Sequence, residues 1–289
     1  MSYKSNLTNH NPDKYQTNAS FVYSAKDSSP VLELLDAQSG EKIIDLGCGT
    51  GQLTIQIKSM VGEGGEVVGV DSNEGMLQSA RSSSPQSITY LQADIQNLQS
   101  FQTSYPDCKG KFDKVFTSAT LHWCKSSPGG VCDLVNWLLK DGGKFVFEFG
   151  GFGNVVGIRS ALHQSLKSIN VDPIPLDPWY FPTVGQYEKV LRSSSLTPQS
   201  VNLVPRPTPL PTDLRGWLET FARNSFLSSL SDEQANQVLD DVVERSRVDN
   251  YWSDNNPGIG VQQSSNDAEG GEGWEVMYVR LRGWATKSQ

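Results

Sequence analysis

The sequence predicts an α/β fold built on a mainly parallel sheet, and three observations carry that prediction. Apolar runs typical of strands alternate with helical stretches through the first half of the 289 residues. The first run leads into a glycine-rich turn, because residues 43 to 51 read Ile-Ile-Asp-Leu-Gly-Cys-Gly-Thr-Gly. A second run, residues 66 to 70, ends in Asp71 twenty residues after the last glycine. A strand, a glycine turn and a second strand tipped by an acid are typical of a parallel sheet that holds a nucleoside.

The elements of the first half follow from this alternation. An amphipathic helix around residues 31–35 precedes the first strand, and we expect it to cover the mouth of the ligand site. We expect strands at residues 42–46, 66–70, 88–91, 112–117 and 143–149. We expect helices at residues 51–61, 74–81 and 129–140.

The composition changes after residue 150. Three glycines at 150, 151 and 153 predict a mobile crossing. Proline-rich segments at 172–183 and 205–211 should be ordered by packing rather than by hydrogen-bond ladders, on either side of a helix at 184–194 and a strand at 200–204. Helices at 212–224 and 231–247 should form a cap within residues 205–250, joined by a second cap element at 21–36. The polar segment 253–273 predicts a mobile loop, and a strand at 274–284 closes the chain.

This organisation makes residues 1–20 a flexible N-terminus and residues 21–289 one domain. The net charge of −8 and the pI near 5.0 argue against nucleic acid or an anionic membrane as the partner. The four cysteines form no CxxC pair, and no His/Cys/Asp group has the spacing of metal ligands, so we expect neither a disulfide framework nor a metal. No apolar stretch reaches the length of a membrane span, and the sequence favours a cytoplasmic monomer or homodimer.

The glycine turn and Asp71 are the main candidates for ligand binding. Gly47, Gly49 and Gly51 can let the backbone turn sharply and approach a ligand closely, since they lack a Cβ. Asp71 can accept hydrogen bonds from both ribose hydroxyls of an adenosine, although a strand-end acid can also cap the next helix. An NAD-dependent dehydrogenase is disfavoured, because the turn reads Gly-x-Gly-x-Gly after Asp45 and not Gly-x-Gly-x-x-Gly.

Two later segments narrow the choice of ligand. The third strand ends in Ala93-Asp94-Ile95, and the fourth runs into Ser118-Ala119-Thr120-Leu121-His122-Trp123. With the glycine turn, these segments resemble the class I S-adenosylmethionine-dependent methyltransferases, whose Rossmann-like sheet has seven strands in the order 3-2-1-4-5-7-6. The resemblance implies S-adenosylmethionine as the cofactor. It implies the following cofactor-binding residues: Asp45, Gly47, Cys48, Gly49, Gly51, Asp71, Ser72, Met76, Ala93, Asp94, Ile95 and Ser118.

The motif Ala-x-Leu-His-Trp at 119 to 123 resembles the trans-aconitate methyltransferase group, which implies methylation of a carboxylate on a small organic acid. A carboxylate is ionised at neutral pH and needs no general base, whereas a phenol benefits from one. His122 is therefore a candidate either for a base or for a donor that orients the acceptor. Methyl transfer to a phenol, nitrogen or carbon centre stays open, as does a regulatory protein that binds the cofactor without turnover.

Aromatic residues and arginines are the candidates for substrate binding. Large aromatic side chains gather in ligand sites, and arginines can hold a substrate carboxylate. The substrate-binding candidates are Tyr23, His122, Trp123, Arg159, Trp179, Tyr180 and Trp217. Arg206, Arg215 and Arg223 are further candidates for the carboxylate anchor.

Overall fold

The computed structural model describes residues 25–253 and 271–288. Its main sheet has the order β3-β2-β1-β4-β5-β8-β6, and the short strand β7 pairs with β8 beside this path. The strands are β1 (Lys42–Leu46), β2 (Glu66–Asp71), β3 (Ile88–Gln92), β4 (Phe112–Ser118), β5 (Leu139–Gly150), β6 (Leu196–Pro209), β7 (Tyr251–Ser253) and β8 (Glu272–Lys287). The pairs among β1 to β5 are parallel, and β8 is antiparallel to both β5 and β6. The expected order 3-2-1-4-5-7-6 is confirmed, because β8 is the seventh strand of the main sheet.

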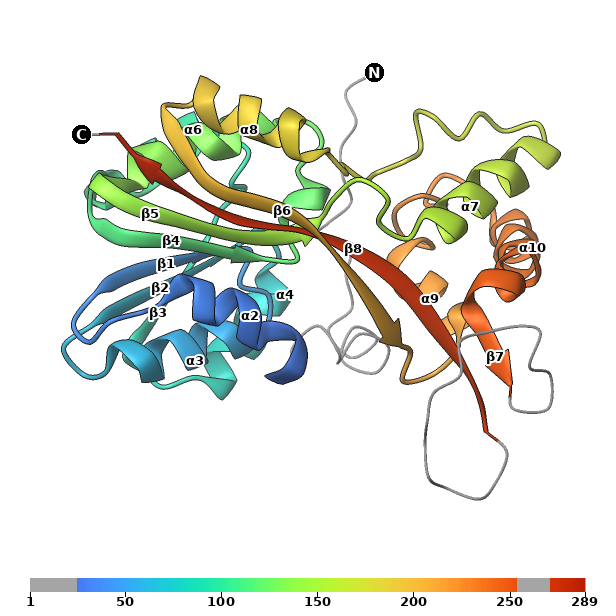
Figure 1. Cartoon of the computed structure of the whole chain (residues 1–289), viewed down its shortest axis with the longest axis horizontal. Helices are drawn as coiled ribbons and strands as arrows, with labels where there is room; N and C mark the ends of the chain where they lie inside the picture. Colours follow the sequence, from blue (N-terminus) through green and yellow to red (C-terminus); the bar gives the residue numbers. More distant parts are fainter. Residues whose placement is uncertain (1–24, 254–270, 289) are drawn as a thin grey trace.

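Helices cover both faces of this sheet (Figure 1). One face carries α2 (Ala25–Leu35), α3 (Gln52–Val61) and α4 (Glu74–Ser83). The other carries α5 (Leu98–Ser104), α6 (Pro128–Leu138) and α8 (Val184–Ser193), which pack on the phenylalanines of β5. The expectation that the first helix and the residues before it cover the ligand mouth stays a prediction, because residues 21–24 lie outside the described residues. The buried residues of α2 among those described, Val31, Leu32 and Leu35, pack on the sheet beside α3, since they are apolar and face Phe116 and Val146.

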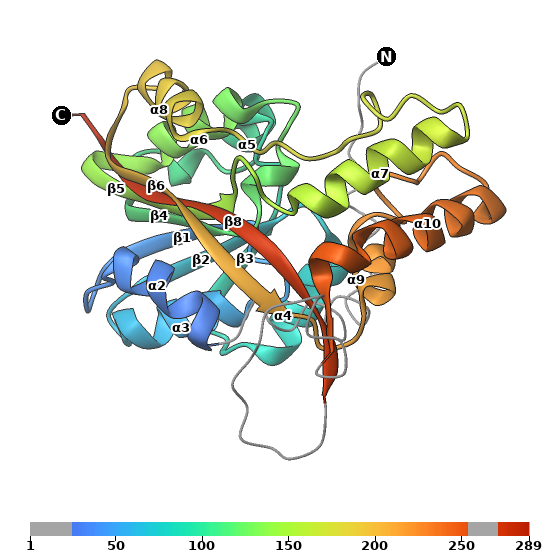
Figure 2. The ribbon, with the colours of Figure 1, turned by 45° about the vertical axis from the view of Figure 1, so that its right-hand side comes forward.

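A helical lobe stands beside the sheet and is built on the long strands β6 and β8 (Figures 1 and 2). It consists of α7 (Val156–Ser168), α9 (Leu214–Phe221) and α10 (Asp232–Asn250), which pack around Val276 and Tyr278 of β8. The sequence analysis predicted α9 and α10 but missed α7. The glycine crossing that we expected to be mobile is instead hydrogen-bonded to β8, since the Gly151 amide donates to the Val279 carbonyl over 2.8 Å and the Val279 amide donates to Asn154 Oδ1 over 2.9 Å.

The second proline-rich segment corrects another expectation. Residues 205 to 209 do not belong to the cap but continue β6, which pairs with β8 as far as Pro209 opposite Glu275. β6 lies at the edge of the sheet, and its prolines recur at positions 205, 207 and 209. Backbone groups point alternately toward and away from the partner strand, so prolines at every second position can all face outward and leave the ladder intact. The first proline-rich segment is an irregular loop between α7 and α8, as expected.

Some expectations fall wholly or partly outside the described residues. The flexible N-terminus at 1–20, residues 21–24 of the first cap element, and most of the predicted loop at 253–273 are among them. The ends of that loop are strand, because Ser253 closes β7 and pairs with Glu272 at the start of β8. In the described part of the chain, no helix is both long and apolar enough to cross a membrane.

Candidate active site

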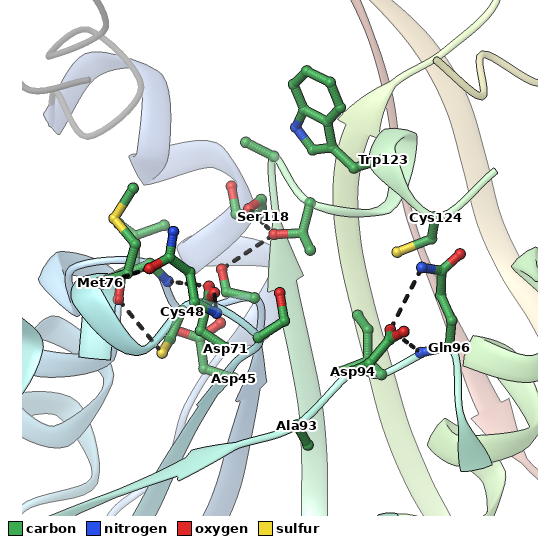
Figure 3. Close-up of a pocket in the computed structure, with 18 residues that line it drawn as sticks. Asp45, Cys48, Asp71, Met76, Ala93, Asp94, Gln96, Ser118, Trp123 and Cys124 are labelled. Atoms are coloured by element: carbon green, nitrogen blue, oxygen red, sulfur yellow. Dashed lines mark hydrogen bonds between the residues drawn. The ribbon is translucent and has the colours of Figure 1, made fainter. Parts of the chain in front are cut away.

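A pocket of about 970 Å³ lies at the carboxyl ends of β1, β2, β3 and β4 (Figure 3). Loops that follow parallel strands meet at this edge of a sheet, so residues distant in sequence converge there. All the residues that the sequence implied for cofactor binding line this pocket except Gly51. The sequence analysis did not single out five further lining residues, Leu53, Asn73, Gln96, Thr120 and Cys124.

The glycine turn after β1 is shaped by close backbone approach. Gly47 has φ of +80°, and a Cβ there would lie 2.2 Å from the Thr120 side chain, whose hydroxyl donates to the Gly47 carbonyl over 3.1 Å. Gly51 begins α3 with φ of +85°, and a Cβ there would lie 2.5 Å from the Tyr90 hydroxyl oxygen. Gly51 is therefore required for the turn into α3 and does not line the pocket, so its implied role in cofactor binding stays a prediction.

Asp71 joins the glycine turn to the end of β2. Its Oδ2 accepts from the Gly49 amide and its Oδ1 from the Asn73 amide, each over 2.9 Å. Asn73, and not Asp71, caps α4, because Asn73 Oδ1 accepts from the Met76 amide over 3.2 Å. Each carboxylate oxygen of Asp71 has a second lone pair with which to accept a ligand hydroxyl. Burial raises the pKa of Asp71, and the hydrogen bonds from backbone amides partly offset this rise.

A second carboxylate lies beside Asp71 at the floor of the pocket. Asp45 is buried within β1 and accepts a 2.7 Å hydrogen bond from the Thr54 hydroxyl. Burial is the main cause that raises the pKa of Asp45 to about 7, and the nearby charge of Asp71 adds to it. Two carboxylates in a partly desolvated pocket disfavour each other's ionised form, and a cationic ligand relieves that repulsion.

The loop after β3 forms the opposite wall. Figure 3 shows Asp94 and Gln96 across the pocket from Asp45, Cys48 and Asp71. Asp94 is exposed, and its Oδ1 accepts from the Gln96 amide over 2.9 Å, whereas Ile95 is buried against the core. This wall therefore offers a carboxylate, an amide and an apolar surface, which are the groups needed to recognise a planar base.

A second, smaller cavity adjoins the first, and Ala119 and Trp123 line both. It lies between the end of the sheet and the helical lobe, with walls from the 3-10 turn Leu121–Trp123, the loop at 173–183, α9 and β8. Its other lining residues are His122, Asn154, Val155, Trp179, Phe181, Trp217, Phe221, Tyr278 and Arg280. Ala119 has φ of +55°, a conformation in which an alanine is strained, at the junction of the two cavities.

His122 lines the second cavity, but its hydrogen bonding argues against the role of a base. Its Nδ1 accepts from the Gly150 amide over 3.3 Å. In a neutral imidazole one nitrogen accepts and the other bears the proton, so an accepting Nδ1 places the proton on Nε2. The ring is then a donor, and the hypothesis of a general base is not supported by this geometry.

The other predicted substrate residues divide into two groups. Trp123, Trp179 and Trp217 line the second cavity as expected. Tyr180 does not line it, because its ring stacks on Phe149 with centroids 6.5 Å apart. Arg159 does not line it either, since its guanidinium lies 2.6 Å from Asp177, a carboxylate that is 2% exposed. Tyr23 lies outside the described residues.

The remaining arginine candidates are also held by carboxylates. Arg206 pairs with Glu148 at 3.5 Å, Arg215 with Glu219 at 3.2 Å, and Arg223 with Asp232. The arginine that lines the second cavity is Arg280, which the sequence analysis missed. The sequence does contain a signal that Arg280 faces the interior. Val276, Tyr278 and Arg280 occupy alternate positions of the last strand, so Arg280 lies on the same face as these apolar and aromatic residues.

The fold and the paired cavities define a class of protein, and comparison with known proteins agrees. Residues 37–167 match a family model described as a methyltransferase domain. The chain is 31% identical over 218 residues to an uncharacterized methyltransferase of Schizosaccharomyces pombe. This match covers 73% of this chain and 80% of that protein. It is 32% identical over 120 residues to trans-aconitate 2-methyltransferase of Escherichia coli, but that match spans only 40% of this chain and 42% of the relative.

A solved structure shows the same fold. Phosphoethanolamine N-methyltransferase 2 of Haemonchus contortus, in complex with phosphomonomethylethanolamine and S-adenosylhomocysteine, superposes with a TM-score of 0.52 at 15% identity. The match covers 96% of this chain and 57% of that one. The chain belongs to the class I S-adenosylmethionine-dependent methyltransferases, and its cofactor is S-adenosylmethionine. No group of three metal-ligating side chains occurs within the described ranges.

Proposed function

We propose that this protein transfers a methyl group from S-adenosylmethionine to a carboxylate oxygen of a small organic acid. One observation carries the proposal. Among the described residues, the lining of the second cavity contains a buried cation, Arg280, and no aspartate or glutamate. Such a lining suits an acceptor that enters as an anion.

The first pocket fits the cofactor by the chemistry of its walls. Asp71 would accept from the ribose hydroxyls, while Asp94, Ile95 and Gln96 would surround the adenine. The carboxylates of Asp45 and Asp71 would favour the positive sulfonium, which supplies an electrophilic methyl group when the cofactor is bound. Ala119 and Trp123 line both cavities, so they would stand where the acceptor meets that methyl group.

Among the described residues that line the second cavity, none has the geometry of a base for an acceptor that must lose a proton. The geometry of His122 makes it a donor, and burial raises the pKa of Tyr278, so that its phenol stays protonated. A carboxylate, with a pKa of about 4, needs no such base. The chain would then mainly exclude water and align the carboxylate with the methyl group, an effect that can contribute roughly 7–11 kcal/mol.

Relatives support more than one kind of acceptor. The relative from Escherichia coli is named for methylation of trans-aconitate, whereas the superposed structure is named for methylation of an amine. An amine acceptor would be cationic before it reacts, and it would be repelled by Arg280. We therefore favour the carboxylate over an amine, a phenol or a carbon centre.

The test is incubation of the full chain with methyl-labelled S-adenosylmethionine and a panel of organic acids, phenols and amines. Labelled product would then be treated with mild alkali, which cleaves methyl esters and releases methanol. We expect the label to leave as methanol. Label that resists alkali would contradict the carboxylate acceptor, and tight cofactor binding without any transfer would support a regulatory protein instead.

A further inference from the structure

We propose that Arg280 selects the substrate, and that the substrate is an apolar acid with a single carboxylate. This inference rests on the proposed function and deepens it. It concerns the second cavity, whose walls are one arginine and a group of large aromatic side chains.

Arg280 carries a positive charge in the wall of the second cavity. Its side chain is buried, with 3% of the residue exposed, and its Nε has no hydrogen-bond partner. Within residues 25–253 and 271–288, no carboxylate lies within ion-pairing distance of its guanidinium. Its guanidinium carbon lies 4.4 Å from the centroid of the Tyr278 ring. A buried cation without a counter-ion is destabilising, so an anionic ligand would stabilise the site on binding.

The neighbouring arginines differ in that each has a carboxylate partner. Arg206 and Arg282 lie on the same face of the sheet as Arg280, and both pair with Glu148. Neither lines the second cavity. Arg280 is therefore the cation that the described part of the cavity offers to a substrate.

The other walls of the second cavity are mainly aromatic. Five aromatic residues line the cavity without a full charge: Trp123, Trp179, Phe181, Trp217 and Phe221. The amide oxygen of Asn154 already accepts from the Val279 amide, and the Tyr278 hydroxyl already accepts from Trp217. These walls suit an apolar or aromatic body, which they would remove from water.

The single charge of Arg280 and the aromatic walls together limit the number of carboxylates that the substrate can carry. One buried guanidinium can neutralise one carboxylate, and a second carboxylate among aromatic rings would be desolvated without a partner. A tricarboxylate such as trans-aconitate is therefore disfavoured, and the carboxylate held by Arg280 is also the methyl acceptor. In the reaction, that oxygen bonds to the methyl carbon, the carbon–sulfur bond breaks, and the sulfur keeps the electron pair, which gives a methyl ester and S-adenosylhomocysteine.

The experiment compares acids that differ by one carboxylate. Octanoate and octanedioate have the same chain length, and 3-phenylpropanoate adds an aromatic body. Each is titrated by calorimetry into the full chain saturated with S-adenosylhomocysteine, and each is then assayed for methyl transfer. We expect octanoate or phenylpropanoate to bind roughly 10- to 150-fold more tightly than octanedioate, the scale of hydrogen bonds to a charged group.

The variants assign this preference to Arg280. Arg280→Gln should weaken binding of the monoacid roughly 10- to 150-fold, and Arg280→Lys should restore part of it. The matched control is Arg282→Gln, two residues along the same face, which should keep the affinity for the monoacid. Unchanged affinity for S-adenosylhomocysteine would show that each variant is folded.

The outcomes separate this inference from the proposed function. A monoacid that binds through Arg280 but receives no methyl group would retain the inference and refute the function. Transfer to octanedioate or aconitate that is as efficient as transfer to the monoacids would retain the function and overturn the inference. Failure of both monoacids to bind, or binding that Arg280→Gln leaves unchanged, would also overturn it.

Discussion

The indole of Trp217 donates a hydrogen bond to the hydroxyl of Tyr278, with 2.6 Å between Nε1 and the oxygen. Trp217 belongs to α9 of the helical lobe, and Tyr278 belongs to β8 of the sheet. Both side chains are buried and both line the second cavity. This bond therefore fixes the helical lobe to the sheet at the wall of the second cavity, two residues before Arg280.

The bond between Trp217 and Tyr278 predicts a measurable coupling energy. Trp217→Phe and Tyr278→Phe should each lower the free energy of unfolding by about 1–3 kcal/mol, because each leaves a buried polar group without its partner. The double variant should lose less than the sum, by about 0.5–3 kcal/mol. Urea denaturation of the four proteins measures this cycle. Strict additivity would show that the bond contributes nothing to stability.

The first pocket could be predicted from the sequence because its residues lie in short segments at strand ends. Gly47, Asp71 and Asp94 each follow a strand that the pattern of apolar residues marks, and parallel strands bring their carboxyl ends together. Gly51 is the exception, because it shapes the turn into α3 and does not line the pocket. A glycine can serve a turn or a ligand, and sequence alone does not distinguish the two.

The second cavity could be predicted only in part, because its walls come from separate elements. Arg159 and Arg280 illustrate the difficulty. Arg159 looked available after the glycine crossing, but Asp177 on a later loop holds its guanidinium. Arg280 was not singled out from the sequence, yet β8 runs between two partner strands and buries it. Ion pairing and burial depend on tertiary contacts, which a local pattern does not contain.

The close approach at Gly47 predicts a stability difference between two glycines of similar conformation. Gly47 and Gly40 have φ of +80° and +85°, but a Cβ meets the Thr120 side chain at 2.2 Å in the first case and nothing within 4 Å in the second. Gly40→Ala should cost about 1–2 kcal/mol from the left-handed backbone alone. Gly47→Ala should cost about 1–3 kcal/mol more, from overpacking. Thermal or urea unfolding gives both values, and equal losses would show that Thr120 moves aside freely.

Asp71 should be required for cofactor affinity. Asp71→Ala should weaken the binding of S-adenosylhomocysteine roughly 10- to 150-fold, because it removes charge-assisted hydrogen bonds to the ligand and also the partner of the Gly49 amide. The control is Asp133→Ala, an exposed aspartate on α6 that does not line the pocket. Isothermal titration calorimetry at fixed pH and salt measures both. Unchanged affinity in Asp71→Ala would refute the ribose-binding role.

Asp45 should make the stability of the unliganded chain depend on pH in an unusual direction. Burial raises its pKa from 3.8 to about 7 in the folded state. Between these two pH values the carboxyl is therefore protonated in the folded chain and ionised in the unfolded chain. Stability from this group is therefore present below pH 4 and falls as the pH rises to about 7. Asp45→Asn cannot ionise and can still accept from Thr54. Its free energy of unfolding should therefore match that of the wild type at low pH and exceed it above pH 7, by on the order of 4 kcal/mol at most.

Asp113 gives the opposite control. Burial favours its neutral form, but hydrogen bonds from Lys140 and from the Lys42 amide lower its pKa. Asp113→Asn should then be less stable than the wild type at pH 7, and the difference should vanish as the pH falls below the usual range of a carboxyl. Urea unfolding from about pH 2 to about pH 8 measures all three proteins. An Asp45→Asn curve parallel to the wild type would contradict the raised pKa.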